Sequence, residues 1–473
     1  MSISKNISNT FVKLGFVLAL LAVVSFCFVG CGGLSTLREN PASDAAVYGN
    51  GGLAVQKGDY VYFVNGYINT SDVADTNHFG KIDHSAIYRA KLTDGKVVET
   101  NVETDEDGEK IVDKTQSIND LEIIVPKVAG FEYSNLYIFG DYIYYSTPNN
   151  LKDRKGEVQS THLHFYRARL DRAGGNDLLY STDAENTEVS ITMYSIGDEV
   201  YQVIKDGEKL VLNTIKGKSV TVKTISEDAH EASLPVYQNS TDVVRDIDKK
   251  IYFTEHTDTG SALKAFDLAS KETEEIFNQA GIEYEIINTN GDYLYYVKTN
   301  SVPPAFSGKI YAMDKNNNEI LVSNQAVTDD IKEYHLAGTN TGASVIYTDG
   351  TSTYFKRSTD ASGTLVLSAD VISEIVDVQG NFMYYIKDSN LYKINYTLAN
   401  QTAELVLPEG TTPKTDSTAN IDIDNKKIFY FVKYTNNYYL HFINFEATDE
   451  DENTYTHFIG KLMEEDYLET SEE

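Results

Sequence analysis

The residues of this chain that most often perform catalysis or bind metals do not form a recognisable pattern. Nine histidines occur, and none belongs to a His-Glu-x-x-His motif. The two cysteines, Cys27 and Cys31, both lie near the N-terminus, so no cysteine and histidine spacing typical of zinc is present. His162 and His164 lie on one face of an expected strand, where a metal or catalytic role is open. We interpret them as a partly exposed strand pair.

No enzyme motif stands out either. The nearest approach to a G-x-S-x-G nucleophile turn is GTSTY at 350, and no phosphate-binding loop is visible. Carboxylate pairs suited to glycoside cleavage remain open, because the sequence of 71 acidic residues does not show their separation in space. We therefore name no catalytic, cofactor-binding or metal-binding residue, expect no cofactor, and favour a non-enzymatic role.

Several aspartates recur at one place in a repeated phrase. A ring of such carboxylates would suit a metal ion, but each follows a glycine or directly precedes an alternating apolar run, which is typical of a tight turn. We interpret them as turn residues. An acidic segment at 103–114, ETDEDGEKIVDK, approaches a calcium loop, but Lys114 stands where a bidentate glutamate is required, so we expect a solvated loop. The recurring aspartates are Asp59, Asp141, Asp198 and Asp292.

The repeated phrase itself predicts the fold. It reads GDYVYFV at 58, GDYIYYS at 140, GDEVYQV at 197, DKKIYFT at 248, GDYLYYV at 291, ASVIYTD at 343, GNFMYYI at 380 and NKKIFYF at 425. A second alternating phrase, such as AIYRAKLTDG at 86, follows most copies, and a weaker third one, such as TLVLSADV at 364, comes next. One aromatic position aligns all eight copies: Tyr62, Tyr144, Tyr201, Tyr252, Tyr295, Tyr347, Tyr384 and Phe429.

Three such strands and a further apolar stretch in each repeat make the four-stranded unit of a β-propeller. We predict an all-β propeller over residues 51–463, with eight blades favoured and seven left open. A row of separate sandwich domains is the structural alternative. The segment THFIGKL at 456 is expected to be a last strand, and completing the first blade is one use open to it. Residues 464–473 form an acidic tail.

The N-terminal segment predicts export. Lys5 and Lys13 precede seventeen uncharged residues, LGFVLALLAVVSFCFVG, as in a signal peptide. The letters FVGC at 28–31 resemble the bacterial lipobox, although Phe28 departs from the usual leucine. We expect residues 1–30 to be a lipoprotein signal peptide, Cys31 to be lipidated, and residues 31–50 to include a flexible tether. An uncleaved anchor and conventional secretion are the alternatives.

The charge of the chain limits its partners. The formal net charge is -31, from 71 acidic and 40 basic residues, which repels phosphate backbones and makes nucleic acid an unexpected partner. Thirty-four tyrosines stand beside no tryptophan, which suits half-buried strand positions.

With the repeat established, residues 51 to about 445 resemble the tyrosine-rich propeller domains of bacterial cell-surface lipoproteins, an uncharacterised family likened to the propeller of low-density-lipoprotein-receptor-related proteins. The words GDYIYY, LYKIN and FYRARLD carry the resemblance, and VIYTDG at 345 approaches the Tyr-Trp-Thr-Asp repeat of those receptors. The chain departs from the receptor pattern by lacking tryptophan and cysteine-rich modules. The resemblance implies an extracytoplasmic propeller tethered to a bacterial membrane.

We therefore expect a membrane-anchored extracytoplasmic lipoprotein whose propeller is a non-enzymatic binding platform for a protein, peptide or glycan. An extracytoplasmic hydrolase or lyase with its site in the propeller funnel is the main alternative. A component or sensor of a cell-envelope complex is the third.

Overall fold

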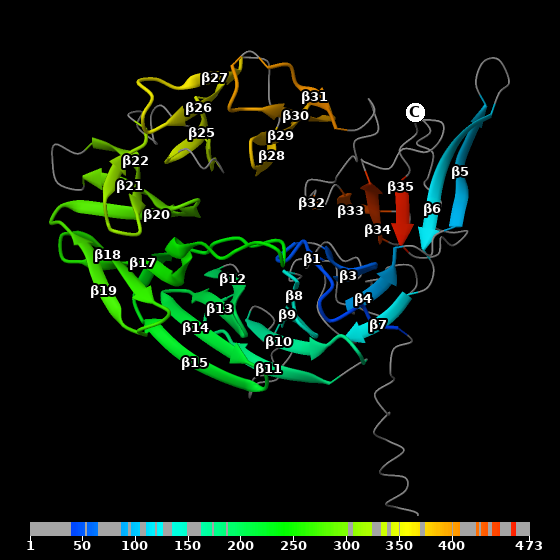
Figure 1. Ribbon diagram of the computed structural model, residues 1–473, viewed down its shortest axis with the longest axis horizontal. Helices are drawn as coiled ribbons and strands as arrows, with labels where there is room; N and C mark the ends of the chain where they lie inside the picture. The colour runs from blue at the N-terminus through cyan, green and yellow to red at the C-terminus, as the bar shows by residue number, and fades with distance from the viewer. Residues whose placement is uncertain are drawn as a thin grey trace, which may run out of the picture.

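The strands of this chain are arranged in a ring of sheets (Figure 1). The computed structural model describes residues 39–52, 54–64, 87–92, 96–104, 110–118, 121–125, 135–148, 162–172, 175–185, 188–300, 306–323, 333–337, 342–349, 351–368, 374–399, 401–406, 422–424, 427–433, 438–444 and 456–459. Within these ranges no α-helix occurs, and no helix is long and apolar enough to cross a membrane. The predicted signal peptide, Cys31 and the acidic tail lie outside the described residues.

The described strands form eight sheets. Six of them are four-stranded, and each is built from four consecutive antiparallel strands. The second sheet holds β8 (Tyr137–Phe139), β9 (Tyr142–Pro148), β10 (Leu163–Arg169) and β11 (Asn176–Ser181). The third holds β12 (Val189–Ile196), β13 (Glu199–Asp206), β14 (Lys209–Lys216) and β15 (Ser219–Ser226). The fourth holds β16 (Ala229–Ala232), β17 (Lys250–Thr257), β18 (Gly260–Asp267) and β19 (Thr273–Asn278), with the 3₁₀ helix η4 (Asp246–Lys249) before β17.

The next three sheets repeat this arrangement. The fifth holds β20 (Ile282–Asn290), β21 (Tyr293–Asn300), β22 (Phe306–Asp314) and β23 (Glu319–Leu321). The sixth holds β24 (Glu333–Leu336), β25 (Ser344–Thr348), β26 (Thr353–Arg357) and β27 (Thr364–Leu367). The seventh holds β28 (Glu374–Gln379), β29 (Phe382–Lys387), β30 (Asn390–Asn395) and β31 (Glu404–Leu405). In Figure 1 the first strands, such as β20 and β28, lie on the inner side of the ring, and the fourth strands lie outside.

The first and last sheets are linked by an inserted hairpin. The first sheet holds β1 (Val47–Tyr48), β2 (Ala54–Lys57), β3 (Tyr60–Val64), β4 (Ile87–Lys91) and β7 (Leu121–Val125). The last holds β32 (Asp422–Asp424), β33 (Lys427–Lys433), β34 (Tyr438–Asn444) and β35 (Thr456–Ile459), joined by β6 (Lys110–Ile118) and β5 (Lys96–Thr104). β35 and β6 run parallel, whereas the other strand pairs are antiparallel.

This hairpin corrects two sequence predictions. The segment 103–114 is not simply a solvated loop, because its ends belong to β5 and β6, which pair with each other, while residues 105–109 lie outside the described part. The strand predicted at 456 exists as β35, but it does not complete the first blade. It pairs with β34 in the last sheet, and β6 of the insertion after β4 occupies its other edge. The insertion after β4 therefore connects the two ends of the ring.

The predicted fold class, an all-β propeller, is confirmed. Each of the eight aligned aromatic positions lies in a strand of a different sheet, from Tyr62 in β3 to Phe429 in β33. The prediction favoured eight blades and left seven open; the described strands group into eight sheets.

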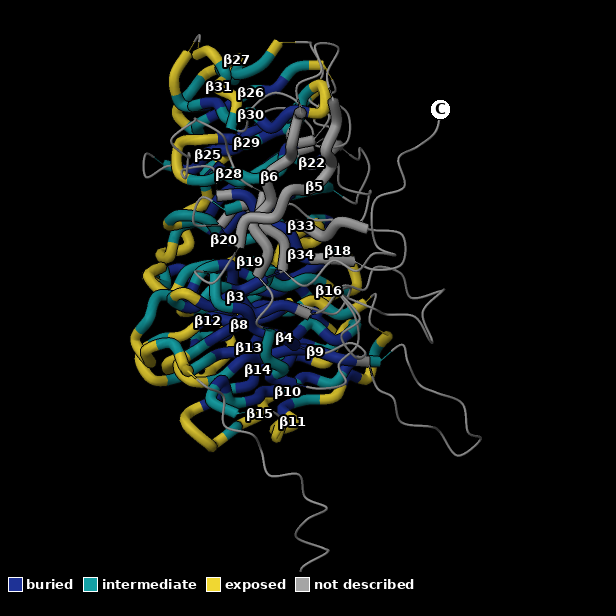
Figure 2. Tube along the Cα trace, turned by 90° about the vertical axis from the view of Figure 1, so that its right-hand side faces the viewer, coloured by how far each residue is buried: buried dark blue, intermediate teal, exposed yellow. Residues whose placement is uncertain are grey.

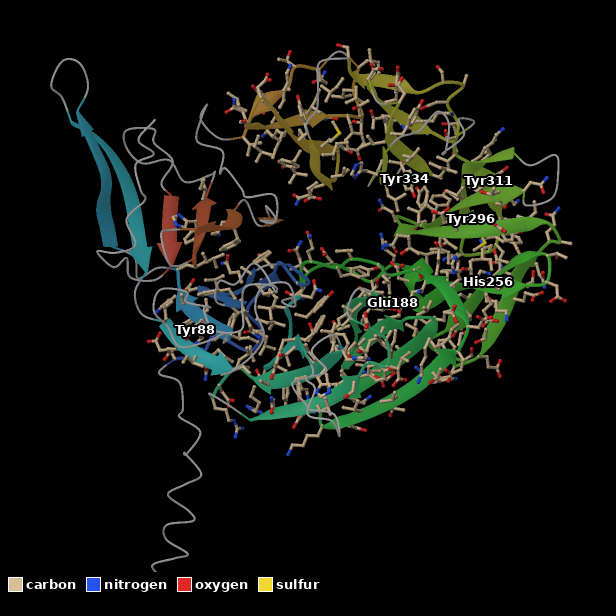
Figure 3. All side chains as sticks on the ribbon, turned by 180° about the vertical axis from the view of Figure 1, so that it is seen from behind. Tyr88, Glu188, His256, Tyr296, Tyr311 and Tyr334 are labelled. Carbon is tan, nitrogen blue, oxygen red and sulfur yellow. The ribbon has the colours of Figure 1, made fainter. Side chains whose placement is uncertain are left out.

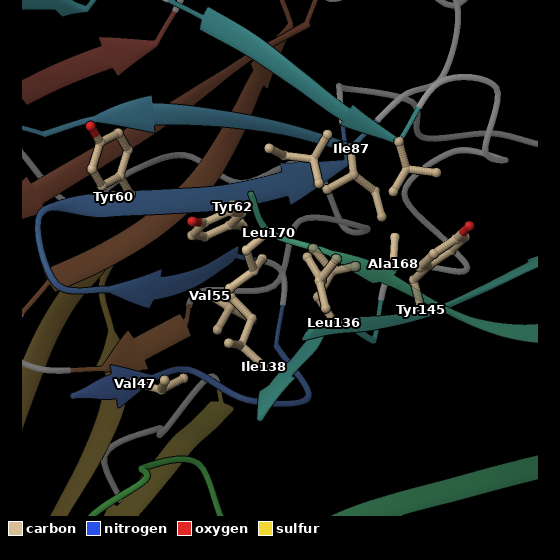
Figure 4. Packing of buried hydrophobic residues seen from close by; sticks show 13 residues of the cluster. Val47, Val55, Tyr60, Tyr62, Ile87, Leu136, Ile138, Tyr145, Ala168 and Leu170 are labelled. Atoms are coloured by element: carbon tan, nitrogen blue, oxygen red, sulfur yellow. The ribbon is translucent and has the colours of Figure 1, made fainter. Parts of the chain in front are cut away.

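The apolar residues of the repeated phrase alternate between two cores, because its strand is covered on both faces. Tyr142 and Tyr144 belong to the core between the second and third sheets, whereas Ile143 and Tyr145 face the first sheet. Figure 4 shows the core between the first and second sheets, where Tyr62 and other residues of the first sheet meet residues of the second. The dark centres of the strands in Figure 2 show the same burial, whereas the outermost strands, such as β15, are largely exposed.

Residues 39–50, which the sequence analysis placed in a tether, pack against the ring. Glu39 accepts hydrogen bonds from Lys91 at 3.0 Å and from Tyr60 at 3.1 Å. Val47 is buried in strand β1 and belongs to the core shared by the first and second sheets. These contacts make residues 39–50 part of the propeller.

Candidate functional site

The connection that leads into β17 is longer than most of its counterparts. In five sheets the strand of the repeated phrase is joined to the strand before it by a two-residue turn. The first residue of this turn is a glycine with φ between +56° and +64°. These turns are 58–59, 140–141, 197–198, 291–292 and 380–381. In the fourth sheet the phrase reads DKK and lacks the glycine, and residues 233–249 join β16 to β17 instead. We call residues 233–249 the strap.

The strap is fastened to several sheets by side-chain and backbone hydrogen bonds. Asn288 of β20 binds both backbone groups of Leu234: its Oδ1 accepts from the amide at 3.1 Å and its Nδ2 donates to the carbonyl at 2.7 Å. In the middle of the strap, Ser240 and Val47 of β1 form two hydrogen bonds of 2.9 Å. The strap therefore reaches from the fifth sheet to the first, as the segment running from β17 towards β1 in Figure 1 shows.

A buried polar cluster holds the strap near β17. The Asp248 side chain is fully buried, and its Oδ2 accepts from Nε of Arg245 at 2.6 Å and also from the hydroxyl of Tyr237. Its Oδ1 accepts from the hydroxyl of Thr289, and its carbonyl accepts from Tyr194 at 3.3 Å. Burial, together with the charge of Asp248, raises the pKa of Tyr237. Because each carboxylate oxygen has a donor, the buried charge is compensated.

A pocket of about 500 Å³ lies beside the strap. Its walls come from the strap, the N-terminal segment, the turn 140–141 of the second sheet and the turn 197–198 of the third. This volume is in the range of small-ligand pockets. We call it the strap pocket.

Charges in the strap pocket are predominantly negative. Four exposed aspartates line it, and Lys57 is its one basic lining residue. Lys57 is only 2% exposed, and its ammonium donates to the carbonyl oxygens of Gly140 at 2.6 Å and Ser43 at 3.1 Å. Burial lowers the pKa of Lys57, an effect that nearby aspartates oppose. The lining aspartates are Asp44, Asp141, Asp198 and Asp242.

The strap pocket also has aromatic and aliphatic surroundings. Tyr142 is half-buried and lines the wall, with the more deeply buried Tyr144 and Tyr237. Val244 of the strap is half-buried and also lines the pocket, whereas the exposed Val236 and Val243 are not among the lining residues. An acidic pocket with apolar side chains beside it suits a ligand with a cationic group and an apolar portion.

A second group of ionisable residues lies on the inner strands. Burial raises the pKa of Glu231 in β16 to about 7, the negative charge of Glu285 adds to this, and the amide of Ile286 donates to its Oε2 and opposes it. Tyr334 of β24, labelled in Figure 3, has its pKa raised by burial and by the charges of Glu285 and Glu231. Burial also raises the pKa of Asp377 in β28, despite a hydrogen bond of 2.7 Å from Gln379.

The residues named from sequence are distributed as follows. The recurring glycines adopt positive φ, which confirms the turn interpretation, and Asp141 and Asp198 in addition face the strap pocket. His162 directly precedes β10, and His164 lies in that strand, with its Nδ1 3.1 Å from the hydroxyl of Tyr166. Among the described residues no group of three or more histidines, cysteines, aspartates and glutamates could hold a metal ion.

Sequence reasoning missed two features. The imidazole rings of His230 and His256, on paired strands β16 and β17, lie 4.5 Å apart, although 26 positions separate them. The strap pocket was the second feature that the sequence did not indicate. The available signal was the fourth copy of the phrase, where DKK replaces Gly-Asp-Tyr and a polar stretch precedes it.

Comparisons with solved structures return propeller proteins. The Dos1 propeller is 11% identical, with 79% of this chain and 87% of that chain covered at a TM-score of 0.44. An oligogalacturonate lyase from Vibrio parahaemolyticus is 11% identical, with 84% and 100% covered and a TM-score of 0.40. TolB from Acinetobacter baumannii is 11% identical, with 86% and 84% covered and a TM-score of 0.30. These likenesses concern the fold alone. No protein-family model matches the chain, and no curated protein matches its sequence.

Proposed function

We propose that this chain is an exported, lipid-anchored propeller of the tyrosine-rich bacterial kind, and that it binds a peptide segment of a partner protein without chemically changing it. The observation that carries the binding role is the strap pocket, with its four aspartates and with Tyr142 and Val244 in its lining. The charges favour a lysine, arginine or amino terminus of the peptide, and the lining Tyr142 and Val244 favour an apolar neighbour in that peptide.

The pocket geometry supports binding in a defined place. Its walls are held by the two hydrogen bonds of Lys57 and by the polar cluster of Asp248, so the pocket is largely formed before a ligand arrives. A preformed site loses little conformational entropy on binding. Apolar and cationic groups of a peptide then enter an acidic pocket whose long-range field also attracts them.

The experiment is a peptide array probed with the full-length protein, followed by titration of the strongest peptide. Asp141→Asn combined with Asp198→Asn removes two pocket charges and keeps the size of each side chain. Loss of charge-assisted contacts at an exposed rim should weaken binding about tenfold. The matched control is Asp59→Asn combined with Asp292→Asn, which changes the same turn position at two residues that are not among those lining the pocket.

Three results would count against this proposal. Equal weakening of peptide binding by the two double variants would show that the peptide does not bind in the strap pocket. Selection of acidic rather than basic peptides would contradict the charge argument. If the protein binds glycans and no peptide, its ligand is a glycan, and the peptide proposal is wrong.

An extracytoplasmic hydrolase or lyase is the second candidate, and Glu231 is the observation that favours it. A carboxyl with a pKa near neutrality, beside the negative charge of Glu285, is suited to act as a general acid. Turnover of a polysaccharide or peptide by the wild type, lost in Glu231→Gln, would establish this function in place of simple binding. Unchanged substrate after prolonged incubation would exclude it for the compounds assayed.

A further inference from the structure

A second pocket of about 500 Å³ shares Tyr142 with the strap pocket. It is formed by β10 and β11 of the second sheet and by residues 218 and 220, at the β14–β15 connection of the third. Tyr142 lines both pockets, but the other lining residues differ. We call this second pocket the arginine pocket.

The arginine pocket carries the opposite charge to most of the protein. Arg167, Arg169, Arg172 and Lys218 line it, against a single lining carboxylate, Asp177. The whole chain has a formal net charge of -31, so four basic side chains at one pocket are a local reversal of sign. A pocket of this sign in such a protein attracts anions only at short range.

Two of the arginines are fixed in position by the fold. Arg167 is 2% exposed, its Nε donates to Asp177 at 3.0 Å and its Nη1 donates to the carbonyl of Gly217 at 2.6 Å. Its guanidinium also lies over the ring of Tyr142, 4.7 Å from the centroid. Arg169 forms two hydrogen bonds of 2.7 Å with Asp171. These contacts orient the guanidinium groups in advance of any ligand.

The other two basic residues are more available. Arg172 shares the Asp171 carboxylate at 3.4 Å, a longer distance than that of Arg169. Lys218 is exposed and also lines the pocket. Leu178, which is 53% exposed, contributes apolar surface to the same pocket. The pocket thus combines fixed positive charge, two accessible cations and an apolar wall.

We propose that the arginine pocket binds a small ligand that carries a carboxylate or phosphate group on a sugar-sized carbon skeleton. Arg172 and Lys218 contact the acid group, Arg167 supplies fixed positive charge behind it, and Leu178 contacts the skeleton. Guanidinium and ammonium groups suit both acids, because each oxygen anion accepts several charge-assisted hydrogen bonds. This site is separate from the strap pocket and does not depend on the function proposed for it.

The test is calorimetric titration of the full-length protein with D-glucuronate, D-glucose 6-phosphate and D-glucose at low salt. At least one of the two acids should bind, whereas glucose should bind much more weakly. The tighter of the two acids identifies whether a carboxylate or a phosphate is the preferred group. Arg172→Ala combined with Lys218→Ala should weaken that binding about tenfold or more, because two charge-assisted contacts are lost.

The matched control is Lys209→Ala combined with Lys393→Ala, which removes two positive charges from residues outside the pocket. It should bind the acid as the wild type does. The proposal is overturned if neither acid binds more tightly than glucose, or if the pocket and control variants weaken binding equally. Thermal unfolding of each variant shows that the fold is retained, which is expected because both Arg172 and Lys218 have solvent-accessible side chains.

Discussion

Arg245 and Asp248 form a buried ion pair within the strap, with 2.6 Å between Nε and Oδ2. The Asp248 side chain is fully buried, whereas that of Arg245 is 23% exposed. The pair bonds to Thr289 of the fifth sheet and to Tyr237 of the strap itself. It therefore fixes one end of the segment that forms the wall of the strap pocket.

Replacing Asp248 should destabilise the protein strongly. Asp248→Ala leaves the guanidinium of Arg245 and the hydroxyls of Tyr237 and Thr289 without their shared acceptor. Breaking a buried pair from one side costs about 3–5 kcal/mol of unfolding free energy. Urea unfolding of wild type and variant measures this difference.

A neighbouring aspartate provides the control for that measurement. Asp246 lies two residues earlier and forms exposed ion pairs with Lys249 and Lys315. Asp246→Ala should change the stability little, because exposed pairs are screened by solvent. Equal effects of the two substitutions would show that burial of Asp248 does not determine its contribution.

Glu231 should make stability depend on pH in an identifiable range. Its pKa is raised from 4.5 to about 7 in the folded chain, so the protonated form is favoured by folding. The corresponding stabilisation is fully present below pH 4.5 and is lost as the pH rises through 7. Allowing for solvent screening, the loss is about 1–2 kcal/mol.

Glu231→Gln tests this dependence, because glutamine is neutral and keeps an oxygen that can accept from the amide of Ile286. The difference in unfolding free energy between wild type and variant should shift in favour of the variant as the pH rises. Chemical denaturation at a series of pH values measures it. A difference that stays constant across this range would contradict the raised pKa.

Two glycines should respond differently to substitution by alanine. A Cβ at Gly260 would overlap the backbone carbonyl of Ile282 in the next sheet, which cannot move as a side chain does. Gly260→Ala should therefore cost about 3 kcal/mol through overpacking. Gly291 has φ +56° and no atom within 4 Å of an added Cβ, so Gly291→Ala should cost only about 1 kcal/mol of backbone strain. Thermal or urea unfolding compares the two, and the reverse order would contradict the close approach at Gly260.

Cys31 tests the proposed attachment to a membrane. If the cysteine carries the lipid, Cys31→Ser should release the protein from membranes or leave its precursor uncleaved. Fractionation and the mass of the N-terminal peptide measure both results. Cys27→Ser is the control, because that residue lies inside the apolar run and should not affect attachment. Full membrane attachment and normal processing of Cys31→Ser would remove the lipid anchor from the proposed function.

The sequence by itself predicted the repeating architecture. The glycines before the strands adopt positive φ as expected, because that requirement is local to a two-residue turn. The alternation of Tyr142, Ile143, Tyr144 and Tyr145 also predicted which residues share a face, since successive strand side chains point to opposite sides. Short-range rules of this kind act between residues that are neighbours in the chain.

Tertiary structure decided the features on which function depends. The hairpin β5–β6 joins the last sheet, the strap reaches β1, and Arg167 meets Gly217, all through contacts between residues far apart in sequence. Neither pocket has a sequence motif, because each is formed by short pieces of several sheets. Local patterns determine the strands and turns of this protein, whereas the packing of neighbouring sheets decides which turns meet and which charges share a pocket.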